Sequence, residues 1–445
     1  MTDIKFDILP QRSALMVDHS TELHALVRIQ GPQMPANRGT DRKALNLSLV
    51  LDRSGSMNGQ PMEEAKRCAA YIIDNLTERD RVSLVVYDSE VSVIVPSTPV
   101  VDKALFKRAI NEIYTRGMTA LFDGWEAGAR QGLVANDGDY LSRVLLLSDG
   151  CANQGLTDTT EIARHCAEMA SAGVSTSTYG LSHNFNEDLM VEMAKAGGGQ
   201  SYYGESAEDL MDPFQEEFSL LSSLCARNLK LSLSAPAGVQ FELLNDYKQL
   251  DDGSWQLPDV SFEGELWALV KITVPADLPA PTNGDDVEIL KGFLSFTDID
   301  TDKADTRSYS LRLPQVPAEA WAAIVEDTNV TARMQEVRVA QIQQQLRTAA
   351  MQRDWRTVDE LIQQAELEAG DNAWLKASLD SIKRYAKSRD SSRMSKEARY
   401  SSQKMMNRMA SVDEYSKDYT LDQESQKARH LRRKGEQGKR MNRPD

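Results

Sequence analysis

Residues 47–57 read Leu-Ser-Leu-Val-Leu-Asp-Arg-Ser-Gly-Ser-Met, an apolar run that ends abruptly in polar side chains. The apolar part has the character of a strand, and Asp52, Ser54 and Ser56 then place one carboxylate and two hydroxyls at alternate positions. Apolar strands followed by helical segments predict a parallel sheet buried on both faces, with ligand sites at the carboxyl ends of its strands. Oxygen donors suit hard cations such as Mg²⁺, Ca²⁺ or Mn²⁺. The stretch therefore predicts a cation site at the end of a buried strand.

Two later stretches extend this site. Residues 117–121 place Thr119 in a glycine-containing loop before a helical pattern, and residues 145–150 form a second buried strand that ends in Asp149. The arrangement resembles the von Willebrand factor A (VWA) family, whose metal-ion-dependent adhesion site has the order Asp-x-Ser-x-Ser, then Thr, then Asp. The residues that match this order are Asp52, Ser54, Ser56, Thr119 and Asp149. The alternative is a polar turn in which Ser54 or Ser56 caps a helix, but five matches in order favour the metal site.

The resemblance implies roles for these residues. Ser54 and Ser56 would coordinate the cation directly, Thr119 directly or through water, and the two aspartates mainly through water or at one edge. A dication bound mostly by neutral hydroxyls keeps positive charge and attracts an outside carboxylate, and Mg²⁺ suits such a site best, with Mn²⁺ or Ca²⁺ as alternatives. The rim that meets the partner is expected to include Met57, Asn58, Met118 and Cys151. In the family, shifts of such loops reach the last helix, here near residues 207–223.

Composition limits the classes of function. The chain has 445 residues, enough for two or three domains, and a formal net charge of −16, which argues against a nucleic-acid-binding body. Residues 381–445 hold 18 Lys and Arg against 9 Asp and Glu, so this segment carries +9 and the rest of the chain −25. A basic cluster at residues 427–434 lies in the segment expected to be disordered. A charged, solubilising terminus is the simplest interpretation, and binding to nucleic acid or an acidic surface is the alternative.

Cysteine usage and the first residues point to a location. Cys68, Cys151, Cys166 and Cys225 lack zinc or redox spacing. Cys68 lies on a helical pattern, so buried thiols are the default, whereas Cys151 is expected near the rim of the site. The first residues show no signal peptide, and no run approaches the roughly 20 apolar residues of a membrane span. These features predict a reduced, cytoplasmic location, as in bacterial cytoplasmic proteins that the VWA pattern resembles.

The chain divides by its periodicity. Residues 44–224 alternate apolar strands and helical segments and resemble a VWA unit, a doubly wound, mostly parallel α/β sheet of Rossmann-like type. Residues 225–314 alternate with period two and predict an antiparallel β-sandwich, with residues 1–43 pairing with it. Residues 315–390 predict a C-terminal helical hairpin region, and residues 391–445 a basic, partly disordered tail.

Two short stretches have competing interpretations. The glycines at 197–199 suggest a phosphate loop, but no Gly-Lys-Ser/Thr follows and a tight turn is favoured. Residues 298–302 read Asp-Ile-Asp-Thr-Asp, like the start of a calcium loop, but Lys303 and Tyr309 occupy the positions where an EF-hand needs Gly and Glu. A solvated hairpin loop is the better interpretation.

These observations favour a cytoplasmic, Mg²⁺-dependent protein-binding scaffold or adaptor that is not an enzyme. The resemblance implies protein partners that offer Asp or Glu to the metal, among them AAA+ ATPases, kinases, phosphatases or defence-system components, and the sequence chooses none of these. A metal-dependent hydrolase is the alternative, with Asp123 and Glu126 as the nearest candidate bases. Nucleic-acid binding would rest on the basic tail alone, and a membrane pore is disfavoured.

Overall fold

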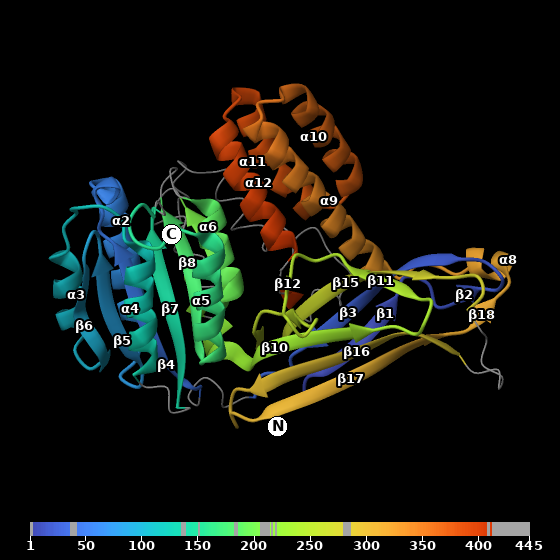
Figure 1. Cartoon of the computed structure of the whole chain (residues 1–445), viewed down its shortest axis with the longest axis horizontal. Helices are drawn as coiled ribbons and strands as arrows, with labels where there is room; N and C mark the ends of the chain where they lie inside the picture. Colours follow the sequence, from blue (N-terminus) through green and yellow to red (C-terminus); the bar gives the residue numbers. More distant parts are fainter. Residues whose placement is uncertain are drawn as a thin grey trace, which may run out of the picture.

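The computed structural model describes most of the chain. The described residues are 3–35, 42–134, 139–149, 152–181, 186–204, 214, 217–218, 220–278, 286–406 and, for the backbone alone, 410–411. They form an α/β domain, a β-sandwich and a helical bundle, which stands against both (Figure 1). This confirms the predicted fold class. None of the described helices combines the length and the apolar character that a bilayer crossing needs.

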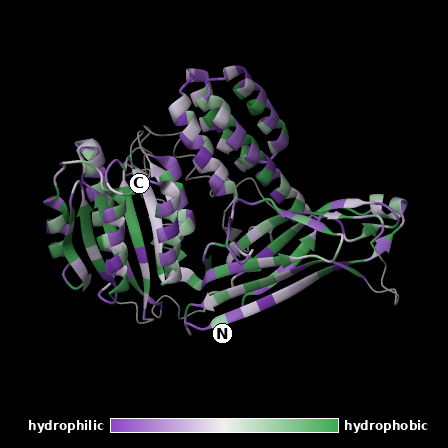
Figure 2. Cartoon of the chain, in the orientation of Figure 1, coloured by the Kyte–Doolittle hydropathy of each residue, from purple (hydrophilic) through white to green (hydrophobic). Residues whose placement is uncertain are grey.

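The α/β domain is built on a six-stranded sheet in the order β6-β5-β4-β7-β8-β9. Only β6 runs antiparallel to its neighbour, and the other pairs are parallel. The strands are β4 (Ala44–Asp52), β5 (Arg81–Tyr87), β6 (Val91–Pro99), β7 (Tyr140–Ser148), β8 (Val174–Leu181) and β9 (Gly198–Gly204). Hydrophobic residues run along these central strands, while the helices mix both kinds (Figure 2).

Helices cover both faces of this sheet. One side of β4 (Leu45, Leu47, Leu49 and Leu51) packs in a core with α2 (Gln60–Asn75) and α3 (Lys103–Asn111). The other side packs with three helices: α4 (Leu121–Leu133), α5 (Thr159–Ser171) and α6 (Glu187–Ala196). A short 3-10 turn, η1 (Gly55–Met57), follows β4 directly. The continuous apolar run of β4 is thus explained by burial on both faces.

A glycine series brings α4 close to the sheet. Gly124, Gly128 and Gly132 recur every four residues and form one face of the helix. A Cβ atom on Gly128 would lie 2.2 Å from Val50 Cγ2, and one on Gly124 would lie 2.4 Å from the Tyr87 ring. The helix backbone therefore lies directly on the strands, and the loop before α4, which carries Thr119, is held at the carboxyl edge of the sheet.

The β-sandwich has two antiparallel sheets around a shared core. One sheet has the order β1-β3-β15-β11, with β19 (Ala410–Ser411) beside β15; its strands are β1 (Lys5–Pro10), β3 (Thr21–Gln30), β15 (Gly264–Val274) and β11 (Gln240–Leu243). The other has the order β12-β13-β10-β16-β17, with β14 (Val260–Ser261) beside β10; its strands are β12 (Lys248–Gln249), β13 (Trp255–Gln256), β10 (Leu224–Ser234), β16 (Val287–Asp298) and β17 (Ala304–Leu313). A small parallel pair joins β2 (Leu15–Met16) to β18 (Gln315–Val316).

The N-terminal strands belong to this sandwich. β3 pairs with β15 along its whole length, from Thr21 opposite Val274 to Gln30 opposite Glu265. The α/β domain lies in the chain between β3 and β10, so the sandwich is made of two separate pieces of sequence.

The helical bundle packs on the outer face of β3 and β15 through Leu26, Trp267 and Leu269. Its helices are α9 (Thr328–Met351), α10 (Trp355–Ala369), α11 (Ala373–Ser388) and α12 (Ser391–Met406), whereas the short α8 (Ala318–Ala322) lies beside β2 at the far end of the sandwich (Figure 1). The sequence pattern differs from the structure here in one respect. Residues 391–406, assigned above to the basic tail, form α12, which packs along α9 and buries Met405 and Met406. The basic cluster at 427–434 lies outside the described residues.

Candidate metal centre

Three loops meet at the carboxyl edge of the α/β sheet. β4 ends at Asp52, β5 at Tyr87 and β7 at Ser148. Backbone hydrogen bonds join the loops after β4 and β5 to each other and to the loop before α4. They run from Arg53 N to Tyr87 O (2.9 Å), from Arg116 N to Arg53 O (2.8 Å), from Gly55 N to Gly117 O (3.2 Å) and from Ala120 N to Asp88 O (2.9 Å). The loops therefore form one connected platform.

Asp52 lies at the centre of this platform and is fully buried. Its Oδ1 accepts a hydrogen bond from Ser54 N (2.8 Å), and its Oδ2 accepts one from Ser148 Oγ (2.6 Å) and a longer one from Tyr87 OH (3.4 Å). Burial raises the pKa of Asp52 to about 6, against the lowering effect of the hydrogen bonds from Ser148 and Ser54. Both carboxylate oxygens are thus used to shape the loop.

The hydroxyl groups gather next to this carboxylate. Ser54 Oγ lies 3.1 Å from Ser56 Oγ. Ser54 is buried and Ser56 is exposed, so the pair lies between the interior and the surface. The backbone N–H of Thr119, which is 2% exposed, donates to Asn153 Oδ1 (2.9 Å), and this bond fixes the loop that carries the third hydroxyl.

Asp149 supplies a buried oxygen without a partner. It is 3% exposed, and its Oδ1 accepts no hydrogen bond from the residues that the structure describes. Burial raises the pKa of this carboxyl, and a hydrogen bond from Ser56 lowers it only in part. A buried acceptor without a donor calls for an explanation, and a cation next to it would provide one. Because no three His, Cys, Asp or Glu side chains cluster as a metal site in the described part of the chain, such a cation would depend on hydroxyl ligands. The donors present fit a hard dication.

The comparisons with known proteins agree with this arrangement. The sequence model of the von Willebrand factor type A domain matches residues 46–216. The chain carries a VWA domain. The remaining residues, the sandwich and the bundle, lie outside that match.

Among curated relatives, the uncharacterized protein sll0103 of Synechocystis is 27% identical over 220 residues, which are 48% of this chain and 51% of that protein. Escherichia coli YfbK is 26% identical over 210 residues, 46% of this chain and 36% of that protein. Human inter-alpha-trypsin inhibitor heavy chain H3 is 25% identical over 226 residues, 47% of this chain and 24% of that protein. The matches thus span about half or less of each relative's length.

Two solved structures share the fold over most of the chain. A von Willebrand factor type A protein from Catenulispora acidiphila aligns with a TM-score of 0.67 at 17% identity, covering 85% of this chain and 90% of that one. The ArnB paralog VWA2 from Sulfolobus acidocaldarius aligns with a TM-score of 0.56 at 16% identity, covering 91% and 98%. At these identities the likeness concerns the fold, and it extends beyond the VWA domain.

The VWA platform also uses residues that the sequence analysis did not single out. Ser148, Tyr87 and Asn153 hold Asp52 and Thr119 in place. Asp88 accepts from Arg53 Nε (2.6 Å) and Arg116 Nε (2.9 Å). Burial alone would raise the pKa of Asp88, but the hydrogen bonds from Arg116 and from the Glu90 backbone, with the charge of Arg53, lower it. Tyr87 and Ser148 end strands, and Asp88 and Asn153 follow them. This position at the carboxyl end of a strand was the sequence signal that could have identified these four residues.

The expected rim is corrected at one residue. Met57 is fully buried, because η1 turns its side chain into the core with the α2 side of the sheet. Asn58 is exposed, and Met118 is 51% exposed on the loop before Thr119. Tyr114, which is 62% exposed, lies on the same loop and was not predicted. Cys151 lies outside the described residues.

Other candidates have structural partners. Glu126 pairs with Arg130 (2.9 Å) along α4, and Asp123 faces the loop at Gly155, where an added Cβ would lie 3.4 Å from its Oδ2. In the loop after β16, Asp298 Oδ1 accepts from Thr301 N and Oγ1 (both 2.9 Å). The aspartate at 298 thus closes its own turn, as expected for a hairpin loop.

Proposed function

We propose that the VWA domain binds Mg²⁺ through Asp52, Ser54, Ser56, Thr119 and Asp149, and that this site captures a carboxylate of a protein partner. The observation that carries the proposal is the unpaired, buried Oδ1 of Asp149 beside the exposed hydroxyl of Ser56. An uncompensated carboxylate oxygen at the end of a buried strand is costly without a cation. The hydroxyls of Ser54 and Ser56 lie close enough to share that cation.

The proposed site residues have different roles. Asp52 uses its oxygens to hold Ser54 N and Ser148 Oγ, so it keeps the loop in shape. Ser54, Ser56 and Thr119 offer neutral oxygens, and Asp149 offers charge. A bound dication would keep positive charge for an outside Asp or Glu carboxylate, because few of its ligands are anionic. Asn58, Met118 and Tyr114 are exposed on the loops that carry the site, and we expect them to meet the partner.

We further propose a scaffold or adaptor role in the cytoplasm. Cys166 is a buried free thiol, which suits a reducing compartment. The sandwich and bundle offer further surface beside the VWA domain. The partner classes named above, such as AAA+ ATPases and kinases, remain part of this proposal.

Titration calorimetry with Mg²⁺, Mn²⁺ and Ca²⁺ tests the metal site. We expect Ser54→Ala and Asp149→Asn to weaken Mg²⁺ binding by roughly 10- to 100-fold, because each removes an oxygen from the site. Ser232→Ala, an exposed serine on β10, should bind like the wild type. Equal affinity in all four proteins would disprove the assignment.

A pull-down from the host's lysate tests partner capture. Wild type with Mg²⁺, wild type with EDTA, and Ser54→Ala with Mg²⁺ serve as baits. A protein retained only by the first bait supports the proposal. A protein retained equally by all three would move recognition to the bundle or the tail.

A further inference from the structure

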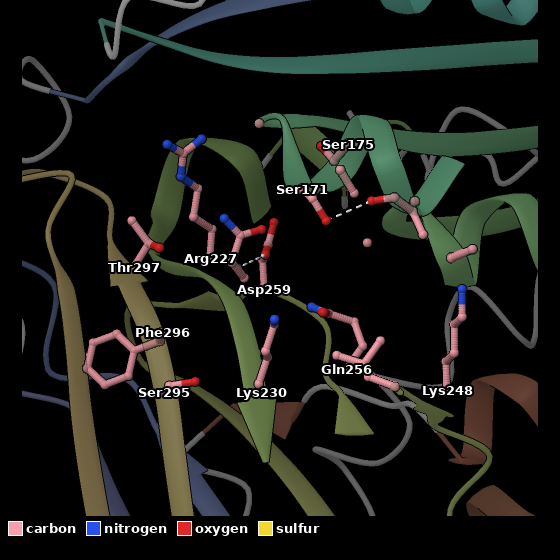
Figure 3. Close-up of a pocket in the computed structure, with 18 of the residues that line it drawn as sticks. Ser171, Ser175, Arg227, Lys230, Lys248, Gln256, Asp259, Ser295, Phe296 and Thr297 are labelled. Carbon is pink, nitrogen blue, oxygen red and sulfur yellow. Dashed lines mark hydrogen bonds between the residues drawn. The ribbon is translucent and has the colours of Figure 1, made fainter. Parts of the chain in front are cut away.

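A cavity of about 600 Å³ separates the VWA domain from the sandwich. Figure 3 shows its residues, with Ser171 and Ser175 of the VWA domain on one side and Lys230, Lys248 and Gln256 of the sandwich on the other. A cavity of this volume is within the range of small-molecule sites, which often lie between domains.

This cavity is distinct from the candidate metal centre. It contacts the start of β7 at Ser142, whereas the metal centre lies beyond Ser148 at the other end of the same strand. Six residues of extended strand separate the two ends by roughly 20 Å. A ligand in the cavity would therefore not share residues with the metal centre.

The sandwich side of the cavity carries a polar row that crosses the sheet. In the strand register each residue of this row lies directly opposite the next one. From β12 to β17 the row is Lys248, Gln256, Lys230, Ser295 and Thr306. Directly opposed residues of antiparallel strands point to the same face. All except Thr306 line the cavity. Two lysines, an amide and a hydroxyl therefore face the VWA domain together, with no acidic residue in the row.

The two ammonium groups have no carboxylate within ion-pair distance in the described part of the chain. The acids at the cavity are otherwise placed. Asp252 accepts from Ser254 N (2.9 Å) and Oγ (2.5 Å), which lowers its pKa, with a smaller contribution from the charge of Lys230. Asp251 is exposed at the edge. Positive charge at this face is thus only partly balanced.

A third cation borders the same space. Arg227 uses its Nη2 to bind Asp302 (2.6 Å), but its buried Nε has no acceptor among the described residues. The remaining carboxylate at the cavity, Asp259, belongs to the buried Arg143, which also binds Glu217 (2.5 Å). In Figure 3 the head group of Arg227 points away from the two lysines, so its unpaired N–H adds a donor at the border of the cavity.

We propose that this interdomain cavity binds a phosphorylated small molecule, whose phosphate lies on Lys230 and Lys248 and whose body lies against apolar residues such as Leu141 and Leu221. A phosphate group has several oxygens for separate donors, and lysine binds it as a point charge. The ligand would contact both domains and so fix their relative position.

Calorimetry and thermal shift at matched ionic strength test this site. They measure the binding of inorganic pyrophosphate, AMP and citrate to the full chain. We expect saturable binding of pyrophosphate or AMP, weakened by roughly tenfold for each ammonium group removed in Lys230→Gln/Lys248→Gln. Ser171→Trp, which fills the cavity without changing charge, should also abolish binding. Lys5→Gln, an exposed lysine on β1, should bind like the wild type.

Three outcomes would overturn the proposal. They are no saturable binding to the wild type, equal binding of citrate and the phosphates, and undiminished binding to the double lysine variant. The alternative is that the lysines only stabilise the partial negative charges at the carboxyl ends of α5 and α6, which also line the cavity. In that case the double variant would melt at a lower temperature than the wild type in the absence of any anion, and the wild type would bind no anion. Mg²⁺ affinity, measured in parallel, should stay unchanged in these variants, so this proposal and the metal proposal fail separately.

Discussion

Asp80 shows how a single buried carboxylate fixes the start of the VWA domain. It is fully buried and accepts hydrogen bonds from Arg42 (2.6 and 2.8 Å), from Leu45 N (2.9 Å) and from Thr77 N and Oγ1 (both 2.8 Å). Burial alone would raise its pKa, but the bonds from Arg42, Leu45 and Thr77 outweigh burial, and the pKa is lowered. The charged form of Asp80 is therefore the one that the fold prefers.

Acid should weaken the protein through this residue. Because the pKa of Asp80 is lower in the folded state than the unfolded value of about 3.9, the unfolded chain binds the proton more readily. The stabilisation is complete above that value and is lost as pH falls through the folded pKa. We expect Asp80→Asn to lower the free energy of unfolding by about 2–4 kcal/mol at pH 7, and by less in acid. Urea unfolding between pH 7 and pH 3 measures both effects.

Asp74→Asn provides the control. Asp74 lies at the end of α2 with an exposed ion pair to Lys107 (2.5 Å), and such pairs contribute little. Its unfolding free energy should follow the wild type at every pH. An Asp80→Asn variant with the wild-type pH slope would contradict the role given to Asp80.

At this scale, the sequence pattern predicts residues that follow strands but misses those that act across them. Asp52, Ser54, Ser56, Thr119 and Asp149 were selected by order along the chain, and the metal role proposed for them awaits the titrations above. The Ser148–Asp52 bond depends on the register of β7 against β4, where Leu147 lies opposite Leu51. A single sequence does not contain that register.

At the scale of elements, periodicity predicts most helices and strands but misses breaks that rest on distant contacts. Residues 318–351 contain no Gly or Pro, which favours one long helix, but the structure ends α8 at Ala322 and begins α9 at Thr328. Asp327 caps α9 by accepting from Asn329 N and Val330 N, and its own N–H donates to Gln11 O (2.9 Å). That last bond joins residues more than 300 positions apart, which local patterns do not reveal.

Gly128 provides a test of how closely α4 packs. In an exposed helix, Gly→Ala would add about 1 kcal/mol of stability. Here the new Cβ would lie 2.2 Å from Val50 Cγ2, so we expect Gly128→Ala to destabilise the protein by about 1–3 kcal/mol. The free energy of urea unfolding gives the value. In a Val50→Ala background the added methyl gains space, so the penalty should shrink, and a double-mutant cycle measures the coupling. A cost of Gly128→Ala that is the same in both backgrounds would rule out this contact as its cause.

At the scale of the whole molecule, ion pairs join the bundle to the VWA domain. Arg347 on α9 binds Asp188 (2.6 Å), and Arg399 on α12 binds Glu192 (2.9 Å), so two bundle helices hold α6. Both arginine side chains are less than one-fifth exposed. The sequence showed an acidic body and a basic C-terminal part, but not that α12 brings its positive charge to α6. Charge composition indicates attraction, whereas the partner surfaces depend on the fold.

The double variant Arg347→Ala/Arg399→Ala should loosen this junction. Salt screens partly buried charge pairs less than exposed ones, but removing the arginines leaves the acids of α6 unpaired, which is destabilising. We expect faster amide hydrogen exchange in α6 and α12 of the double variant, and a smaller change in the wild type at high salt, with β4 and β7 unaffected. Arg356→Ala is the matched control, because Arg356 is 90% exposed and its one ion pair among the described residues is with Glu360 along α10 (3.1 Å). If the double variant exchanges as slowly as the control, apolar contacts hold the bundle in place, and the charge pairs contribute only specificity.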